Sequence, residues 1–184
     1  MMEKTLTDVI PEFALIDDEK LKKGSLATFV EALQLGGWQP EDMAEIPFTL
    51  LIEPCPQSLL AHTRGVVRVS LAVAKALMAA YPDEAAFRYD EDALIAMALL
   101  HDVGKLLEYE RTANGKYVKS EWGKRQRHPD SGAELAEKHG LPQKVVDGIR
   151  YHSHEGDGKR DTVEAIIVNH ADFINFEPLK LKYG

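Results

Sequence analysis

One stretch of the chain, residues 93–107, constrains the fold more than any other. Residues 93–100 carry few polar side chains, so a helix formed by them is expected to be buried on all sides. The run closes on the adjacent pair His101-Asp102, and Val103, Gly104 and Lys105 follow directly. Burying an imidazole and a carboxylate costs free energy unless both are paired or bound to metal. An isolated pair of this kind is most often a hydrogen bond at a helix end, so the rest of the chain must decide between these interpretations.

Length and composition fit one domain with its own core, because the chain has 184 residues of which 45% are hydrophobic. No apolar run approaches the roughly 20 residues of a membrane span, and the N-terminus lacks a signal-peptide layout. We therefore expect a cytoplasmic location and no membrane partner. Cys55 is the only cysteine, which excludes an intramolecular disulfide and a thiolate metal cluster.

The net charge of −8 is concentrated at the N-terminal end of the chain. Residues 1–57 hold four basic and eleven acidic side chains, whereas residues 58–184 hold 18 and 19. This overall acidity argues against duplex nucleic acid as a partner and leaves small phosphorylated substrates open.

Residues 1–57 are expected to form an acidic extension or cap. Residues 1–23 are polar and weakly periodic, which predicts a loosely packed segment. A helix is predicted over about 25–35, with Ser25 as its N-cap and Gly36-Gly37 at its end. Four prolines between residues 38 and 56 predict irregular structure after it.

From residue 58 onward the pattern is helical and predicts an all-α domain over 58–178. Helices are expected over about 60–80, 92–106, 128–139, 141–152 and 161–176, the last with Asp161 as N-cap and Glu164 completing a capping box. Asn114-Gly115 predicts a two-residue turn in one small β-hairpin near residues 108–120. Pro178 is expected to end the last helix, leaving residues 179–184 as a tail.

The seven histidines all follow residue 61, and four of them lie near the ends of four predicted helices: His62, His101, His128 and His152. Asp172 lies inside a fifth helix. Imidazole nitrogens and carboxylate oxygens suit iron, manganese, zinc, cobalt or nickel. Four histidines and two aspartates suffice for two such ions if one carboxylate bridges them. Asp102 is the natural bridge, because His101 beside it fixes one ion.

The ordered set His62, His101-Asp102, His128, His152 and Asp172 resembles the HD-domain metal-dependent phosphohydrolase superfamily. Its local contexts are similar too: LLHDVGK at 99–105, HPDSGA at 128–133, IRYH at 149–152 and HAD at 170–172. The six-ligand pattern resembles the dinuclear branch, which includes bacterial bis-nucleoside tetraphosphate hydrolases.

The resemblance implies the helical HD-domain fold and two divalent or mixed-valence transition-metal ions. One ion would take His62, His101, Asp102 and Asp172, and the other would take His128, His152 and the second oxygen of Asp102. A hydroxide between the ions would attack phosphorus, so no serine or cysteine nucleophile is needed. The implied substrate is a small phosphorylated molecule, in the first place a nucleotide.

Several other residues are candidates for catalysis or substrate binding, each with a plainer alternative. Lys105 is predicted to contact a phosphate or to be a solvated lysine. His154 is predicted to contact substrate or to replace His152 as ligand, since His152, Ser153, His154 and Glu155 resemble the His-His-Glu motif of HD-GYP phosphodiesterases, although no GYP motif is present.

A basic run over residues 111–127 adds Arg125 and Arg127 as candidate phosphate clamps, unless the run is a solvated face. Trp122 or Tyr117 would stack on a base or belong to the core. His170 and His139 are expected to be structural.

Three other functions remain open at this stage. The same six ligands serve mixed-valence di-iron oxygenases of this superfamily that act on phosphonate or polyol-like substrates. A non-catalytic HD signalling module and a nuclease for single strands are the others. A homo-oligomer is compatible with all of them.

Overall fold

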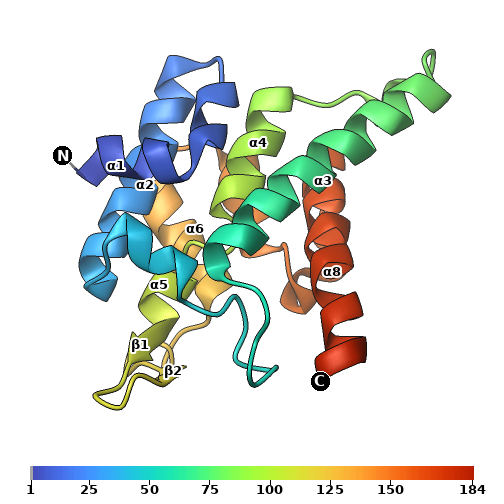
Figure 1. The fold of residues 1–184 in the computed structure, drawn as a ribbon. Helices are drawn as coiled ribbons and strands as arrows, with labels where there is room; N and C mark the ends of the chain where they lie inside the picture. The colour runs from blue at the N-terminus through green and yellow to red at the C-terminus, as the bar shows by residue number, and fades with distance from the viewer. Residues whose placement is uncertain (1) are drawn as a thin grey trace.

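The computed structural model describes residues 2–184 and shows a mostly helical protein with one β-hairpin, as predicted (Figure 1). The helices are α1 (Met2–Val9), α2 (Glu19–Gly36), α3 (Leu59–Ala80), α4 (Glu91–Leu100), α5 (Lys105–Glu108), α6 (His128–Lys138), α7 (Gln143–Arg150) and α8 (Val163–Tyr183), and the strands are β1 (Tyr109–Arg111) and β2 (Tyr117–Lys119). Short 3-10 helices lie at Pro11–Leu15, Pro40–Ala44, Ala85–Phe87 and His154–Gly156.

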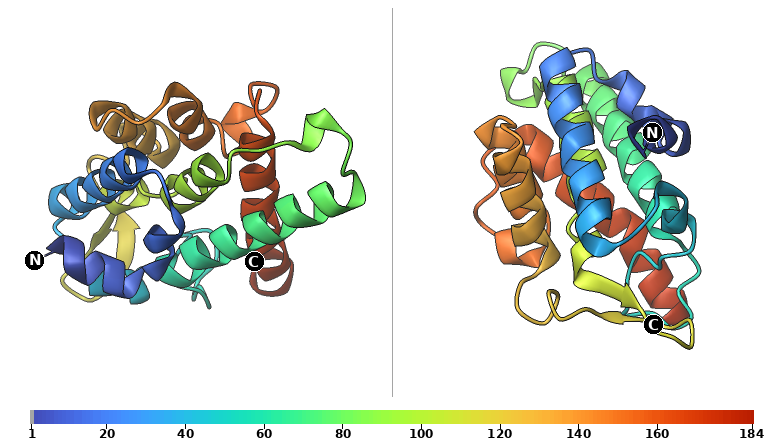
Figure 2. Two further views of the ribbon diagram at one scale, coloured as in Figure 1. Left: turned by 90° about the horizontal axis from the view of Figure 1, so that it is seen from above. Right: turned by 90° about the vertical axis from the view of Figure 1, so that its left-hand side faces the viewer.

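Helix α4 lies at the centre of the fold, as its apolar sequence predicts. Residues 93–100 are each at most 1% exposed, and the helix packs against α2, α3, α7 and α8. Two views at right angles show the other helices arranged around it (Figure 2). A helix that is apolar on every side has no polar face to expose to water, so other elements bury it.

The predicted single helix over 92–106 is wrong, because the structure breaks it at residues 101–104. Hydrogen bonds there join residues three apart, with Val103 N donating to the Leu100 carbonyl and Lys105 N to the Asp102 carbonyl. These tighter turns separate α4 from α5 and lie at the pair His101-Asp102.

The N-terminal segment is not loosely packed, which corrects the expectation for residues 1–23; Met1 itself lies outside the described residues. Leu6, Ile10, Phe13 and Ile16 are at most 1% exposed and belong to the main core. Their spacing of four, three and three residues is helical, and Pro11 interrupts it.

Helix α2 begins earlier than predicted and ends where predicted. Asp18, not Ser25, is its N-cap, since the Asp18 carboxylate accepts hydrogen bonds from Lys20 N and Leu21 N at 2.8 and 2.9 Å. Gly37 ends the helix in the left-handed conformation (φ 75°) that glycine adopts without strain.

Residues after α2 pack directly on the elements that carry the motif. The Trp38 indole N–H donates to the Leu106 carbonyl at 2.8 Å, and a Cβ on Gly36 would lie 2.0 Å from that same oxygen. Leu59 N donates to the Ile46 carbonyl at 2.7 Å, which holds the loop of residues 47–58 against the start of α3. This loop brings Phe48 beside the histidines described below.

The hairpin forms where predicted, but its turn is longer. Arg111 pairs with Tyr117, which leaves five residues, 112–116, between the strands rather than two. Thr112 N donates to the Lys116 carbonyl and Gly115 N to the Thr112 carbonyl, so an extra local turn closes the loop. Gly115 supplies the positive φ of 81° that this turn needs.

The last helix differs from its prediction at both ends. Thr162, not Asp161, is the N-cap of α8, and the Glu164 carboxylate accepts a hydrogen bond from Asp90 N at 2.6 Å. Helix α8 continues through Pro178 to Tyr183. Pro178 lies on the exposed part of the helix, where losing one backbone N–H donor leaves the freed carbonyl open to water.

Candidate metal centre

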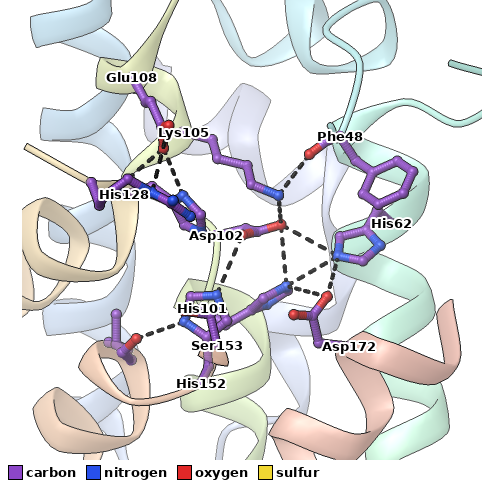
Figure 3. A network of polar contacts seen from close by, with 12 residues as sticks. Phe48, His62, His101, Asp102, Lys105, Glu108, His128, His152, Ser153 and Asp172 are labelled. Carbon is purple, nitrogen blue, oxygen red and sulfur yellow. Dashed lines mark hydrogen bonds and ion pairs between the residues drawn. The ribbon is translucent and has the colours of Figure 1, made fainter. Parts of the chain in front are cut away.

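The six side chains that the sequence offers as metal ligands are buried or nearly buried, and they converge at one point in the interior (Figure 3). They form two groups of possible ligands that share Asp102. The atoms of each group lie within 4.8 Å of one another; the first group is His62, His101, Asp102 and Asp172, and the second is Asp102, His128 and His152.

The two oxygens of Asp102 divide the histidines into these groups. Oδ2 lies 3.3 Å from His62 Nε2 and 3.4 Å from His101 Nε2. Oδ1 lies 3.2 Å from His128 Nε2 and 3.6 Å from His152 Nε2. Asp102 is therefore placed as a bridge between the groups.

Helix termini supply most of these side chains. His62 lies in the first turn of α3, His101 and Asp102 follow the last residue of α4, and His128 opens α6. His152 lies two residues past α7, where it is only 1% exposed. Asp172 comes from the middle of α8 and completes the first group, with Oδ1 3.0 Å from His62 Nε2.

The hydrogen bonds of two histidines leave Nε2 free for a metal. Nδ1 of His101 contacts the Ala98 carbonyl at 2.8 Å, and Nδ1 of His152 contacts the Ile149 carbonyl at 2.7 Å. Since these oxygens only accept hydrogen bonds, Nδ1 carries the proton and a neutral ring turns an Nε2 lone pair toward Asp102.

Such an arrangement fits a bound cation. His101 Nε2 lies 3.2 Å from His62 Nε2. This spacing suits two nitrogens that bind the same ion, each at about 2.1 Å. Lone pairs that face one another and a carboxylate repel unless protons or a metal ion lie between them. The imidazole and carboxylate donors present match borderline divalent transition metals.

The carboxylates of the centre are held in their charged form. Burial would raise the pKa of Asp102, but the buried Lys105 ammonium outweighs it and holds that pKa well below its usual range. Burial likewise opposes the charge on Asp172, but its hydrogen bond with His62 lowers the Asp172 pKa to about 2. Both groups are thus ready to bind a cation at neutral pH.

Lys105 links the centre to the loop of residues 47–58. Its buried ammonium donates to Asp102 Oδ2 at 2.7 Å and to the Phe48 carbonyl at 2.6 Å. The Phe48 ring stacks on His62 with 4.4 Å between ring centroids. The loop therefore contacts the first group of possible ligands, a role that the sequence pattern did not indicate.

Glu108 is a further residue of the site that sequence reasoning missed. It is 3% exposed, and Oε2 accepts a hydrogen bond from His128 Nδ1 at 2.6 Å and another from His128 N at 3.1 Å. Burial would raise the Glu108 pKa, but the hydrogen bonds from His128 and Lys119 lower it to about 2. The signal in the sequence was an acid flanked by the apolar residues Leu107 and Tyr109.

A cavity of about 440 Å³ opens beside the cluster, and Asp102, His128, His152 and Asp172 lie in its wall. The apolar part of the lining includes Leu50, Leu51, Phe173 and Phe176. The lining also carries the cations Lys119 and Arg127.

The remaining predicted site residues divide between this cavity and the surface. Lys105, Arg127 and His154 line the cavity, whereas Arg125 is exposed and is not part of its described lining. The His154 side chain is 78% exposed and packs edge-on against Phe173, so His152, and not His154, belongs to the second ligand group.

Other residues considered from the sequence have simpler surroundings. His139 contacts Glu31 at 2.7 Å, and His170 lies exposed on α8. Tyr117 packs against Trp38, and Trp122 is 45% exposed.

Comparison with known proteins agrees with the fold and the cluster. The HD domain family matches residues 59–175, and the chain belongs to this family. Residues over a 119-residue stretch are 33% identical to Ribonuclease Y from Desulforudis audaxviator (strain MP104C). This stretch is 65% of the chain and only 18% of that protein. No solved structure matches the chain significantly. Among residues 2–184, no helix has the length and apolar character to cross a membrane.

Proposed function

We propose that this protein is a metal-dependent phosphohydrolase that cleaves a phosphoester or phosphoanhydride bond of a nucleotide. The observation that carries the proposal is the convergence of four imidazole Nε2 atoms and Asp172 on the two oxygens of Asp102. In this proposal His62, His101, Asp102 and Asp172 hold one ion, and Asp102, His128 and His152 hold a second. Bound ions of this kind supply a hydroxide nucleophile at neutral pH and stabilise charge on phosphoryl oxygens.

The cavity wall offers groups suited to the two parts of a nucleotide. Lys119 and Arg127 supply positive charge for phosphates, and the Arg127 side chain is 51% exposed although it pairs with Glu155 at 3.3 Å. Phe173 and Phe176 follow Asp172 on α8 and give an apolar surface for a base. A volume of about 440 Å³ suits a small-molecule ligand.

Lys105 and His154 both line this cavity and are proposed to contact the substrate. An ammonium group has three donors, and Lys105 uses two of them on Asp102 and Phe48. The third N–H is the one proposed to contact a phosphoryl oxygen. His154 lies at the exposed end of the cavity and is proposed to contact the substrate beyond the scissile bond.

The match to Ribonuclease Y favours a second candidate, a nuclease that acts on single strands. In that case the cavity would accept one nucleotide of a longer chain. The two candidates differ in substrate length, so one panel of substrates separates them.

The test begins with metal analysis of protein purified without chelator. About two equivalents are expected, with turnover of nucleotides or, for the second candidate, of single-stranded RNA. His62→Gln is expected to lose one equivalent and most activity, while His170→Gln, on the exposed side of α8, retains both. Metal-free wild-type protein, or full turnover in His62→Gln, would contradict the proposal; oxygen uptake without phosphate release would point to an oxygenase instead.

A further inference from the structure

His128 differs from the other histidines of the cluster in what holds its ring. His101 and His152 each follow a helix, and a carbonyl three residues earlier accepts their Nδ1 proton. His128 opens α6, so no helical turn precedes it to supply such a carbonyl. The buried carboxylate of Glu108 occupies that place, 20 residues away in sequence (Figure 3).

The contact between Glu108 and His128 permits one neutral tautomer. A carboxylate accepts hydrogen bonds and donates none, so a neutral His128 ring must carry its proton on Nδ1. Nε2 is then unprotonated and faces Asp102 Oδ1 at 3.2 Å. The second hydrogen bond, from His128 N to the same Glu108 oxygen at 3.1 Å, fixes the ring's position at the start of α6.

The other oxygen of Glu108 is held independently. Oε1 lies 3.3 Å from Lys119 Nζ and 3.9 Å from Arg127 Nε. Both cations line the cavity beside the cluster. Glu108 thus connects His128 to the two cations proposed for phosphate binding.

We propose that Glu108 is a positioning residue that fixes the tautomer and orientation of His128 and thereby sets the affinity of the second metal position. This rests on the proposed function, because it assumes that His128 binds a metal. A carboxylate behind a metal-binding histidine raises the basicity of the ring and contributes about 10- to 100-fold in metal affinity. The first position, built on His62 and His101, does not depend on this contact.

Two substitutions test the role. Glu108→Ala removes the acceptor, and we expect the affinity of one metal equivalent to fall about 10- to 100-fold while the other stays unchanged. Glu108→Gln can keep its amide oxygen on the two donors of His128 but loses the charge and the oxygen that faces Lys119, so it is expected to retain an intermediate affinity. Glu121→Ala, at an exposed glutamate that pairs with Lys124, is the matched control and keeps both equivalents.

The tautomer of His128 can be measured in metal-free protein, so it tests the role of Glu108 independently of the proposed function. Nitrogen-15 NMR of the histidine rings in metal-free protein, at about pH 8 where an ordinary imidazole is neutral, is expected to show the Nδ1–H tautomer for His128 in wild type and Glu108→Gln. A shift toward Nε2–H is expected in Glu108→Ala.

The outcomes are distinct. An unchanged tautomer in Glu108→Ala, or wild-type affinity for both ions in both variants, overturns the role of Glu108. If Glu108→Ala does not fold, a wild-type affinity in Glu108→Gln overturns it alone. Failure of wild type to bind metal would instead overturn the proposed function, while the tautomer result would still stand.

Discussion

Gly104 of the HDVGK motif is required for space rather than for backbone freedom. Its φ is −65°, a helical value that any residue adopts. A Cβ at this position would lie 2.2 Å from the His128 carbonyl oxygen, 2.6 Å from Ser131 Oγ and 2.9 Å from Gly132 N. The start of α6 therefore lies directly against Gly104, and Gly104→Ala should push the two apart.

The size of this displacement follows from the contact. Moving the His128 oxygen from 2.2 Å to an acceptable distance of about 3.0 Å requires a shift of about 0.8 Å. Functional groups need placement within about 0.5 Å, and Asp102 Oδ1 and His128 Nε2 are only 3.2 Å apart across this interface. We expect Gly104→Ala to lose the metal held by His128 and to lower the free energy of unfolding by about 1–3 kcal/mol.

Urea denaturation and metal analysis measure the two effects. Gly115→Ala is the matched control, because a Cβ there meets nothing within 4 Å and the residue lies in the hairpin turn, away from the cluster. Its positive φ of 81° makes the substitution cost backbone strain of about 1–2 kcal/mol without changing metal content. Wild-type stability and two metal equivalents in Gly104→Ala would refute the reasoning.

Three further predictions concern charges at the centre. Asp102→Asn is expected to lose both metals and nearly all activity, whereas Asp130→Asn, exposed on α6, retains them; metal analysis and turnover decide. Lys105→Met leaves Asp102 without its buried cation, so metal-free protein should lose about 3 kcal/mol in urea denaturation; added metal should restore part of it, and an equal loss with and without metal would contradict this. The pKa of Glu108 is about 2 in the folded protein against an ordinary 4.5. The charged carboxylate therefore adds about 3 kcal/mol to the free energy of unfolding of metal-free protein above pH 4.5. That contribution disappears as the pH falls from about 4.5 to about 2, so Glu108→Gln should show a weaker loss of stability over this range, and parallel acid-unfolding curves would contradict the assignment.

The part of the fold that could be predicted from the sequence is the part with strong periodicity. Helix α4 lies at the centre because residues 93–100 leave no polar face, and α3 follows its long apolar pattern. Short amphipathic segments were missed, because the helical spacing of Leu6, Ile10 and Phe13 is interrupted by Pro11. Pro178 predicts a helix end, but α8 continues through it because an exposed helix tolerates one missing donor.

The candidate metal ligands drew attention in the sequence because of their residue types and positions. His62, His128 and His152 lie near helix ends, and their division into two groups followed from the resemblance to the HD-domain superfamily. Glu108 had no comparable local pattern, since its partner is 20 residues away and they meet only through the packing of α5 on α6. The periodicity of apolar residues in the sequence does not indicate tertiary contacts of this kind.

The basic run over residues 111–127 shows how the structure changes the meaning of a charge pattern. Arg111 pairs with Glu45 at 3.2 Å and Lys116 with Glu53 at 3.6 Å, so the acidic N-terminal segment neutralises the strands' outer end. Lys119 and Arg127 remain at the cavity, and both lie close to Glu108. An incoming phosphate would therefore compete with Glu108 for the cations that hold it. Because the other oxygen of Glu108 holds His128, one carboxylate would connect the charge of the proposed substrate with the proposed second metal position.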